Sequence, residues 1–408
     1  MTPGLWNIIT GVIALSLIYS SISIYSILGK IGSRVWVNVN HVDDRKLPKV
    51  TVILPFYRET PEDIEMTFRS LALQSYPKDL IDVYIILERD DIETINHVSS
   101  LRHILEDRGL KTYVVINQNS RRSKASAINL MLNRIDGDVV VIYDAGDVVN
   151  DEHHIAKAVK LIGMGYDVVG CKVLRVGDNL LGKLSLIDTV LWYNVALPGL
   201  VAITGFPLVS GEGMAISRDF MTKINGLPDK LTEDSYLTIL AARYGRKIAL
   251  LDSVIYEGAP RNIKGLIKQR LRWYRGYIEC LKDLTLHHGR ELSVSNVVKL
   301  VIIYIQPLAL LSMPTAVTVL ALSHLVYVDT CAFYASLIAV ISMILAPLYV
   351  LIELDIRDVS ALVAPMYWIF QGLIVLITLM PIRIRWLRTE RYALKFKSIT
   401  WSTSSTHL

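Results

Sequence analysis

The chain has 408 residues, of which 52% are hydrophobic and 20% are charged, and its net charge is +5. A mean hydropathy of +0.39 argues against an ordinary soluble protein, and the charged fraction argues against a compact bundle of membrane helices. The basic residues cluster beside apolar runs, which favours membrane lipids and phosphorylated substrates over nucleic acid as partners. Three scattered cysteines without metal-ligand spacing indicate a reducing compartment and no structural disulfide: Cys171, Cys280 and Cys331.

The first apolar run, Leu5 to Leu28, holds no charged residue and is long enough to cross a bilayer. Lys30 and Arg34 follow it, so the positive-inside rule places the N-terminus outside and the residues after 30 in the cytoplasm. A cleavable signal peptide is the alternative, but the run is too long for an h-region and no cationic segment precedes it. Residues 1–30 are therefore predicted to form an N-terminal transmembrane helix.

Residues 36–260 alternate short β-branched runs with amphipathic segments. The expected strands are 50–54, 82–87, 112–116, 138–143 and 167–172. The expected helices between them are 61–74, 92–107, 122–134 and 151–163. This alternation predicts an α/β domain with a Rossmann-like, mostly parallel sheet that is covered on both faces.

Ligands bind such domains beyond the carboxyl ends of the strands. Polar residues gather at these positions after the first, second and fourth expected strands: Tyr57, Arg58, Glu59, Glu88, Asp90, Asp91, Asp144 and Asp147. Paired carboxylates such as Asp144 and Asp147 can hold a hard divalent cation, which would neutralise a diphosphate leaving group. A turn cap or an ordinary loop charge is the alternative interpretation of this pair.

Residues 180–210 interrupt the alternation with an apolar stretch that contains Lys183, Asp188, Pro198 and Pro207. These interruptions favour an interfacial or buried segment, with a membrane span as the alternative.

Residues 263–281 read as an amphipathic helix on which Gln269, Arg272 and Trp273 share one face at i, i+3 and i+4 spacing. A basic helix on anionic lipid is one interpretation of the segment. An amide, a guanidinium and an indole together also suit a diphosphate and a sugar ring, and both interpretations can hold. Residues 261–295 are therefore predicted to form an amphipathic interface region.

Two further motifs have an ordinary structural explanation beside a functional one. Glu233 and Asp234 follow Thr232 at the start of a helical run, which suits an N-cap with an acidic first turn. Asp234 would instead be a general base if it faced a cleft. Lys124 opens another helical run, where it is either solvated or binds phosphate oxygens.

Residues 296–358 hold two apolar runs, 300–322 and 331–352, which predict a transmembrane hairpin with a turn at Asp329. A third run, 361–382, is followed by a basic tail: Arg383, Arg385, Arg388, Arg391, Lys395 and Lys397. If this run crossed the membrane, the tail would lie outside, against the positive-inside rule. Residues 359–408 are therefore predicted to form an interfacial or re-entrant helix and a cytoplasmic tail, which leaves three spans in a multi-pass protein of the cell membrane.

Taken in order, the motifs resemble those of the family 2 glycosyltransferases of the cellulose-synthase-like type, whose catalytic domain has the GT-A fold. The resemblance covers about residues 48–283, and T-E-D followed by Q-x-x-R-W is its most discriminating part. A W-S-T at Trp401 to Thr403 is similar to the family's gating segment. The motifs are LPFYRE at 54–59, an acidic cluster after the second strand, KASAIN at 124–129, YDAGD, GEGMAISRDF at 211–220, TED at 232–234 and QRLRW at 269–273.

The resemblance implies a role for each matching residue. Asp234 would be the catalytic base, and Asp144 with Asp147 would hold a divalent metal, Mn or Mg. The implied donor-binding residues are Pro55, Tyr57, Glu59, Glu88, Asp90, Asp91, Lys124, Asp144, Gln269 and Arg272. The implied acceptor-binding residues are Gly211, Glu212, Glu233 and Trp273. The chain departs from the family's D-x-D because Gly146 stands at the third position, where Asp147 follows one residue late.

One base without a carboxylate nucleophile predicts a single displacement with inversion. Three or four spans are too few to enclose a polar channel, so we expect a hexose to be moved to a polyprenyl-phosphate-linked acceptor, in the assembly of protein-linked or envelope glycans. Family resemblance favours GDP-mannose over UDP-glucose as donor. The alternatives are a processive β-glycan synthase and a non-catalytic nucleotide-binding membrane regulator.

Overall fold

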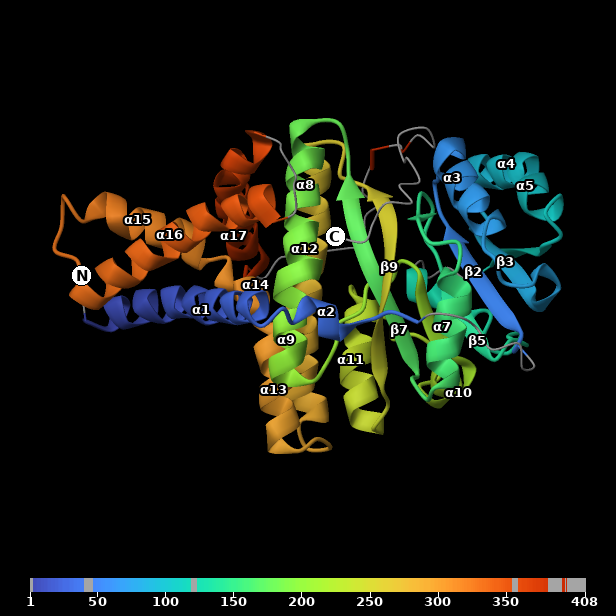
Figure 1. Cartoon of the computed structure of the whole chain (residues 1–408), viewed down its shortest axis with the longest axis horizontal. Helices are drawn as coiled ribbons and strands as arrows, with labels where there is room; N and C mark the ends of the chain where they lie inside the picture. The colour runs from blue at the N-terminus through green and yellow to red at the C-terminus, as the bar shows by residue number, and fades with distance from the viewer. Residues whose placement is uncertain are drawn as a thin grey trace.

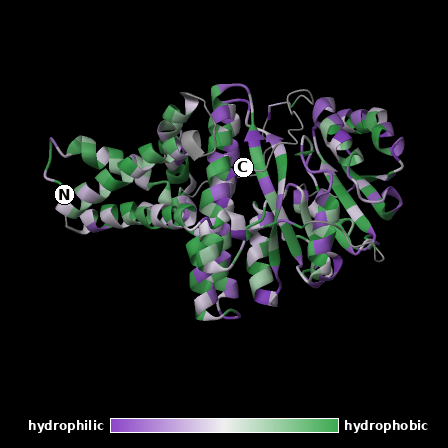
Figure 2. Cartoon of the chain, in the orientation of Figure 1, coloured by the Kyte–Doolittle hydropathy of each residue, from purple (hydrophilic) through white to green (hydrophobic). Residues whose placement is uncertain are grey.

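The computed structural model describes residues 3–39, 47–118, 123–353, 359–380, 391–392 and 394. A sheet with its helices lies on one side of the molecule, and long helices extend from it on the other (Figure 1). Figure 2 shows that the helices farthest from the sheet are mostly hydrophobic along their length. The predicted division into an α/β half and an apolar helical half is confirmed.

The strands form one sheet. They are β1 (Trp36–Val37), β2 (Val50–Phe56), β3 (Ile81–Glu88), β4 (Lys111–Asn117), β5 (Val139–Ile142), β6 (Val148–Val149), β7 (Val168–Val176), β8 (Met214–Ser217) and β9 (Ile248–Gly258). The order is β1-β9-β7-β8-β5-β2-β3-β4, with β6 paired to β9. Only the pairs that involve β8 or β6 are antiparallel among the described strands. All five expected strands are present, and the sheet is mostly parallel as predicted.

Short helices cover the sheet, and local capping residues set where several of them begin. Thr60 accepts the backbone N–H of Asp63 just before Pro61, and Ser123 forms a capping box with Ser126. The helices of this half are α2 (Gly32–Val35), α3 (Pro61–Ala72), η1 (Lys78–Leu80), α4 (Ile92–Leu101), α5 (His103–Glu106), α6 (Lys124–Asn129), α7 (His154–Gly163), α10 (Arg218–Lys223) and α11 (Glu233–Tyr244).

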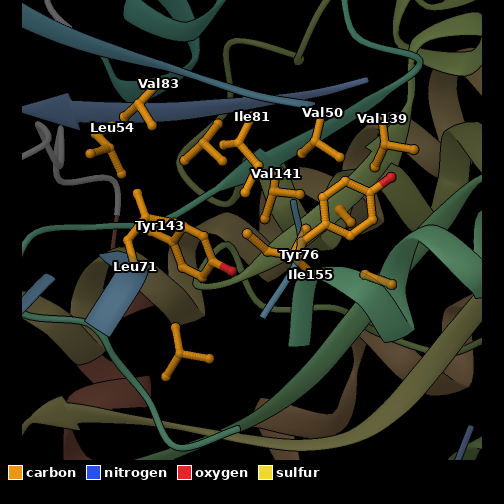
Figure 3. Close-up of a cluster of buried hydrophobic side chains, with 14 of the residues drawn as sticks. Val50, Leu54, Leu71, Tyr76, Ile81, Val83, Val139, Val141, Tyr143 and Ile155 are labelled. Carbon is orange, nitrogen blue, oxygen red and sulfur yellow. The ribbon is translucent and has the colours of Figure 1, made fainter. Parts of the chain in front are cut away.

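An apolar core fixes the strands that carry the site loops. Figure 3 shows side chains of β2, β3 and β5 meeting Leu71 of α3 and Ile155 of α7. Tyr76 is buried among them, and its hydroxyl donates to the carbonyl of Pro48 at 2.6 Å. Each fully buried aliphatic side chain contributes roughly 1.5–3 kcal/mol, so the carboxyl ends of these strands form a rigid edge.

The other half consists of longer helices. They are α1 (Pro3–Leu28), α8 (Leu180–Leu191), η2 (Trp192–Ala196), α9 (Leu197–Thr204), α12 (Ile263–Asp283), η3 (Leu284–His288), α13 (Val294–Tyr304), α14 (Gln306–Ala309), α15 (Ser312–Leu322), α16 (Thr330–Glu353), η4 (Val359–Val363) and α17 (Ala364–Thr378). Within the described part of the chain, four helical segments are long and apolar enough to cross a membrane: Gly4–Leu28, Leu180–Thr204, Thr330–Tyr349 and Ser360–Thr378.

Helices α1, α15 and α16 run side by side away from the sheet (Figure 1). Ile13, Ala316 and Ala339 meet in their shared core, where small side chains allow close helix packing. The predicted turn at Asp329 is confirmed, because its carboxylate accepts the N–H groups of Cys331 and Ala332. The run predicted at 300–322 is helical, but it is not one continuous helix.

That run is a broken pair, in which Val294–Tyr304 and Gln306–Leu322 are bent by 47°. The physical reason is Pro307, which has no N–H to donate to the preceding turn.

The helix predicted at 263–281 is α12, which begins at Ile263 after the capping side chain of Asn262. Helices α8 and α12 cross the direction of α1 and α16, and α17 lies against α12 (Figure 1). The placement of 180–210 as an interfacial or buried segment, and of 361–382 as an interfacial or re-entrant helix, stays a prediction.

Candidate active site

A cavity of about 610 Å³ lies where the carboxyl edge of the sheet meets α1, α12 and α16. Five of the motifs identified in the sequence contribute to its wall, although up to about 150 residues separate them along the chain. The charged and aromatic residues that line it from this side include Lys124, Asp144, Glu212, Glu233, Asp234, Arg272 and Trp273. The predicted convergence of carboxylates and the α12 face on one crevice is therefore present.

The YDAGD loop follows β5 and places Asp144 at the cavity. The carboxylate of Asp144 forms an ion pair with the ammonium group of Lys124 at 2.7 Å. Gly146 has a φ of 84°, a left-handed conformation that favours glycine and turns the loop back on itself. The glycine that departs from D-x-D thus has a backbone role here.

Asp147 is the last residue of this loop, and its side chain is fully buried. Its Oδ2 accepts the backbone N–H of Asp144 at 2.8 Å, while Oδ1 has no hydrogen-bond partner among the described residues. Burial and the neighbouring Asp144 raise the pKa of Asp147 well above its ordinary value. The described residues contain no group of three or more carboxylate, His or Cys ligands that could hold a metal. The two aspartates therefore fit a divalent cation only if the diphosphate and water complete its coordination.

The T-E-D motif opens α11, but it does not act as a plain N-cap. Thr232 makes no capping hydrogen bond, and its hydroxyl lies 3.9 Å from the sulfur of Cys280. Asp234 is partly exposed to the cavity, and its Oδ2 accepts the N–H of Gly211 at 2.9 Å. The two predicted motifs GEG and TED are thus joined directly.

The electrostatics of the site raise the proton affinity of its carboxylates. Burial raises the pKa of Asp234, and the nearby Glu212 raises it further. Burial and Asp234 together raise the pKa of Glu233 to about 7. Burial alone would lower the pKa of Lys124, but Asp144 and Glu233 hold it above its ordinary value. The site thus holds a charged lysine beside carboxylates that accept a proton more readily than usual.

Of the two residues of α12 that were predicted to bind the donor, only one lines the cavity. Arg272 lines the cavity, and its Nη1 donates to the carbonyl of Leu231 at 3.3 Å. Gln269 does not line the cavity, because it lies on the buried side of the helix with 1% of its surface exposed. The structure therefore places Arg272 but not Gln269 at the cavity, and the role of Gln269 in donor binding stays a prediction.

Trp273 lines the cavity between two guanidinium groups. Those of Arg175 and Arg270 each lie 4.4 Å from the centre of its ring. Arg175 also pairs with Glu212 at 3.2 Å, and Arg270 pairs with Asp188 at 2.8 Å. These contacts hold the indole in place by cation–π attraction.

The other predicted donor-binding residues form a separate group at the ends of β2 and β3. None of them lines the cavity; they are Pro55, Tyr57, Glu59, Glu88, Asp90 and Asp91. Asp91 caps α4, and Glu88 accepts a hydrogen bond from Asn117 at 2.9 Å. Because β5, β2 and β3 are neighbouring parallel strands, this group lies along the same edge as Asp144. Its role in donor binding stays a prediction.

Sequence reasoning missed several charged residues at the site: Arg175, Asp188, Glu257 and Arg270. The available signal was a charge inside an otherwise apolar strand or helix, which rarely occurs without a partner. Arg391 was assigned to the basic tail, yet it also lines the cavity. Trp401 to Thr403 lie outside the described residues.

The sheet order and the strand-edge site define a GT-A transferase domain. Residues 48–276, more than half of the chain, match the profile described as Glycosyltransferase like family 2. The chain belongs to this family, and its long apolar helices suit a membrane protein.

Two curated relatives illustrate the range of the family. The probable glycosyltransferase YdaM of Bacillus subtilis (strain 168) is 28% identical over 240 residues, which cover 57% of this chain and 56% of YdaM. The undecaprenyl-phosphate 4-deoxy-4-formamido-L-arabinose transferase of Serratia proteamaculans (strain 568) is 32% identical over 124 residues, 30% of this chain and 36% of that protein. The chain thus matches about half or less of the length of these relatives.

A solved structure extends the likeness to the whole fold. The mannosyltransferase PcManGT from Pyrobaculum calidifontis, in complex with GDP-Man and Mn2+, superposes with a TM-score of 0.61 at 21% identity. The superposition covers 90% of this chain and 97% of that chain. The shared architecture therefore extends beyond the α/β domain into the apolar helices.

Proposed function

We propose that this protein is an inverting hexosyltransferase that moves a sugar, mannose in preference to glucose, from a nucleotide donor to a polyprenyl-phosphate-linked acceptor. The observation that carries the proposal is the continuity of one cavity, which joins Asp234 to a wall formed by membrane helices. A soluble acceptor would have no use for such a wall.

Asp234 is the base in this proposal. The acceptor hydroxyl oxygen attacks the anomeric carbon while Asp234 takes its proton, and the bond from that carbon to the diphosphate breaks with its electron pair leaving on the diphosphate. The N–H of Gly211 fixes Oδ2 of Asp234, and the raised pKa makes this carboxylate a better proton acceptor than an exposed aspartate. One displacement inverts the anomeric configuration.

The leaving diphosphate gathers negative charge at the end of β5. Lys124 and Arg272 line the cavity there and are placed to stabilise it. Asp144, with Asp147 beneath it, would hold a divalent cation, Mn or Mg, which when bound supplies further positive charge to the diphosphate. PcManGT, whose structure contains GDP-Man and Mn2+, supports both the metal and GDP-mannose as the favoured donor.

The acceptor would enter from the membrane. On the helical side the cavity is lined by apolar side chains such as Ile27 of α1, Leu310 just after α14, and Met343 and Ala346 of α16, with serines of α1 among them. This surface suits a prenyl chain, whose transfer from water is favourable. The relative named as an undecaprenyl-phosphate transferase supports a lipid-linked acceptor. With Lys30 and Arg34 after α1, the catalytic half would face the cytoplasm.

Product length tests this proposal. The purified full chain is incubated with GDP-mannose or UDP-glucose, Mn2+ or Mg2+, and a polyprenyl-phosphate-linked sugar. We expect the addition of one or a few hexoses to the lipid-linked acceptor. Long polymer would instead identify a processive β-glycan synthase, and the absence of transfer and donor hydrolysis with every donor and metal would identify a nucleotide-binding regulator.

A further inference from the structure

Beyond Met380, the described residues are Arg391, Tyr392 and Leu394, here named the C-terminal strap. The strap lies at the ends of β7 and β9. Arg391 forms an antiparallel bridge with Pro260, and the N–H of Tyr392 donates to the carbonyl of Ala259 at 2.8 Å. The hydroxyl of Tyr392 also donates to the carboxylate of Asp178.

The surface beneath the strap is shaped to receive it. A Cβ at Gly258 would overlap the carbonyl of Tyr392, and one at Gly177 would lie 3.5 Å from the Tyr392 ring. Leu394 is 8% exposed and packs with Met66 and Val148 beside the YDAGD loop. Backbone pairing, the close approach at Gly258 and an apolar anchor together indicate a specific docking site for the strap.

Docking places the guanidinium of Arg391 directly over the loop that carries Asp144. Its Nη1 donates to the carbonyl of Ala145 at 3.3 Å, and its Nη2 lies 2.6 Å from Oε1 of Glu257. Glu257 is fully buried and also pairs with Arg175 at 2.6 Å. Two arginines therefore hold the Glu257 carboxylate, which in turn fixes the position of Arg391.

The charge of Arg391 changes the balance of the cavity. Its lining includes five carboxylates, Asp144, Asp188, Glu212, Glu233 and Asp234, and five cations, Lys124, Arg175, Arg270, Arg272 and Arg391. Without Arg391, five carboxylates would face four cations, and a polyanionic ligand would meet less positive charge. A guanidinium has five N–H donors, so the two contacts above leave further donors for phosphate oxygens.

We propose that Arg391 binds the diphosphate of the nucleotide donor and that Glu257 is the positioning residue that holds it there. This inference rests on the proposed function. The ligand class is a nucleoside diphosphate, whose oxygens suit the planar fork of an arginine. A nucleoside without phosphates would make no contact with Arg391.

Calorimetric titration of the full chain with GDP, UDP, guanosine and uridine tests the proposal, in buffer with Mn2+. For the better-bound diphosphate, Arg391→Ala should raise Kd about 10-fold to 100-fold, the range for hydrogen bonds to charged groups. Arg391→Lys should retain part of the affinity, because it keeps the charge and loses the fork. Glu257→Gln should weaken diphosphate binding less than Arg391→Ala does. Arg243→Ala, which removes a surface partner of Glu291, is the matched control and should bind as the wild type does.

The nucleosides separate a binding role from a structural one. All variants should bind the corresponding nucleoside as the wild type does, so that only the advantage of diphosphate over nucleoside falls. Equal diphosphate affinity in wild type and Arg391→Ala would overturn the inference, as would a parallel loss for nucleoside and diphosphate. If Arg391→Ala does not fold, Arg391→Lys and Glu257→Gln decide in the same way. A wild type that binds neither GDP nor UDP would overturn the proposed function itself.

Discussion

At the scale of single residues, Asp234 is defined by what surrounds its carboxylate. Gly211 and Ser235 donate backbone N–H groups to its two oxygens, at 2.9 and 2.7 Å, and burial raises its pKa. The hydrogen bonds orient the carboxylate, and the raised pKa makes it a better proton acceptor than an exposed aspartate. The cavity leaves one side of it open to an acceptor hydroxyl.

Replacing the proposed base Asp234 by an amide of the same shape gives the first prediction. Asp234→Asn should lower the rate of hexose transfer by about 10²-fold to 10⁴-fold, the usual contribution of a general base, and leave the Kd of the donor nearly unchanged. The control is Asp219→Asn, at an exposed carboxylate that pairs with Arg246. Equal transfer rates for wild type and Asp234→Asn would remove Asp234 from the mechanism.

Glu233 gives a prediction about pH. Folding raises its pKa from the ordinary 4.5 to about 7, chiefly by burial, so the folded protein holds this proton more tightly than the unfolded chain does. Its stabilising contribution is therefore complete below pH 4.5 and is lost as the pH rises through 7. Glu233→Gln mimics the protonated acid at every pH.

We thus expect Glu233→Gln to match the Tm of the wild type at pH 4.5 and to exceed it at pH 8, measured by thermal unfolding in detergent. A gain of the same size at both values would contradict the assigned pKa shift.

At the scale of elements, the fit of α11 against α12 joins the helix of Asp234 to the helix of Arg272. Thr232, at the start of α11, packs closely on Gly276 of α12. A Cβ added at Gly276 would lie 2.5 Å from Cγ2 of Thr232. Cys280, one turn further on, contacts the hydroxyl of the same threonine. The register of these two helices therefore sets the position of Asp234 relative to Arg272.

Adding one methyl group at this contact should disturb both stability and transfer. Gly276→Ala would gain up to about 1 kcal/mol from helix propensity, but overpacking of a core costs typically 1–3 kcal/mol. We expect a lower Tm together with a lower transfer rate.

Gly163→Ala is the matched control, because no heavy atom lies within 4 Å of a Cβ at that helical position. It should leave the rate unchanged and keep or raise the Tm. A Gly276→Ala protein as stable and active as the wild type would show that this helix contact is loose.

At the scale of the whole molecule, the two halves share one cavity, and the membrane side of that cavity should be selective for acceptor chains. Ala346 of α16 lines the cavity, whereas Ile344, two residues earlier, is 53% exposed on the outer surface of the same helix. A large side chain at position 346 would therefore fill the cavity, whereas one at position 344 would extend from the outer surface of the helix.

Ala346→Phe should raise the KM for a long-chain polyprenyl acceptor by roughly tenfold, in line with the effect of small steric changes in apolar pockets. The KM for an acceptor with a two-isoprene chain and the Kd of the donor should stay close to the wild-type values. Ile344→Phe is the control and should alter none of them. Equal effects on both chain lengths would place the prenyl chain elsewhere.

Several strands and several of the site residues could be predicted from the sequence. Alternating β-branched and amphipathic segments predicted β2, β3, β4, β5 and β7, because the periodicity of a strand or a helix is a local property. Four strands were not predicted: β1 and β6 have only two residues each, β8 has four, and β9 carries Asp252 and Glu257. The order of motifs identified Lys124, Asp144, Asp234, Arg272 and Trp273, which the structure gathers in one cavity.

The ion pairs of the site, in contrast, could not be predicted from the sequence. Arg391 reaches Glu257 across 134 residues of chain, and Arg270 reaches Asp188 across 82, and neither spacing carries a local signal. Gln269 belongs to a matching motif, yet the packing of α12 buries it away from the cavity. The physical reason is that a charge removed from water requires a partner, and which partner is near depends on the packing of whole elements, not on the neighbours of a residue in the sequence.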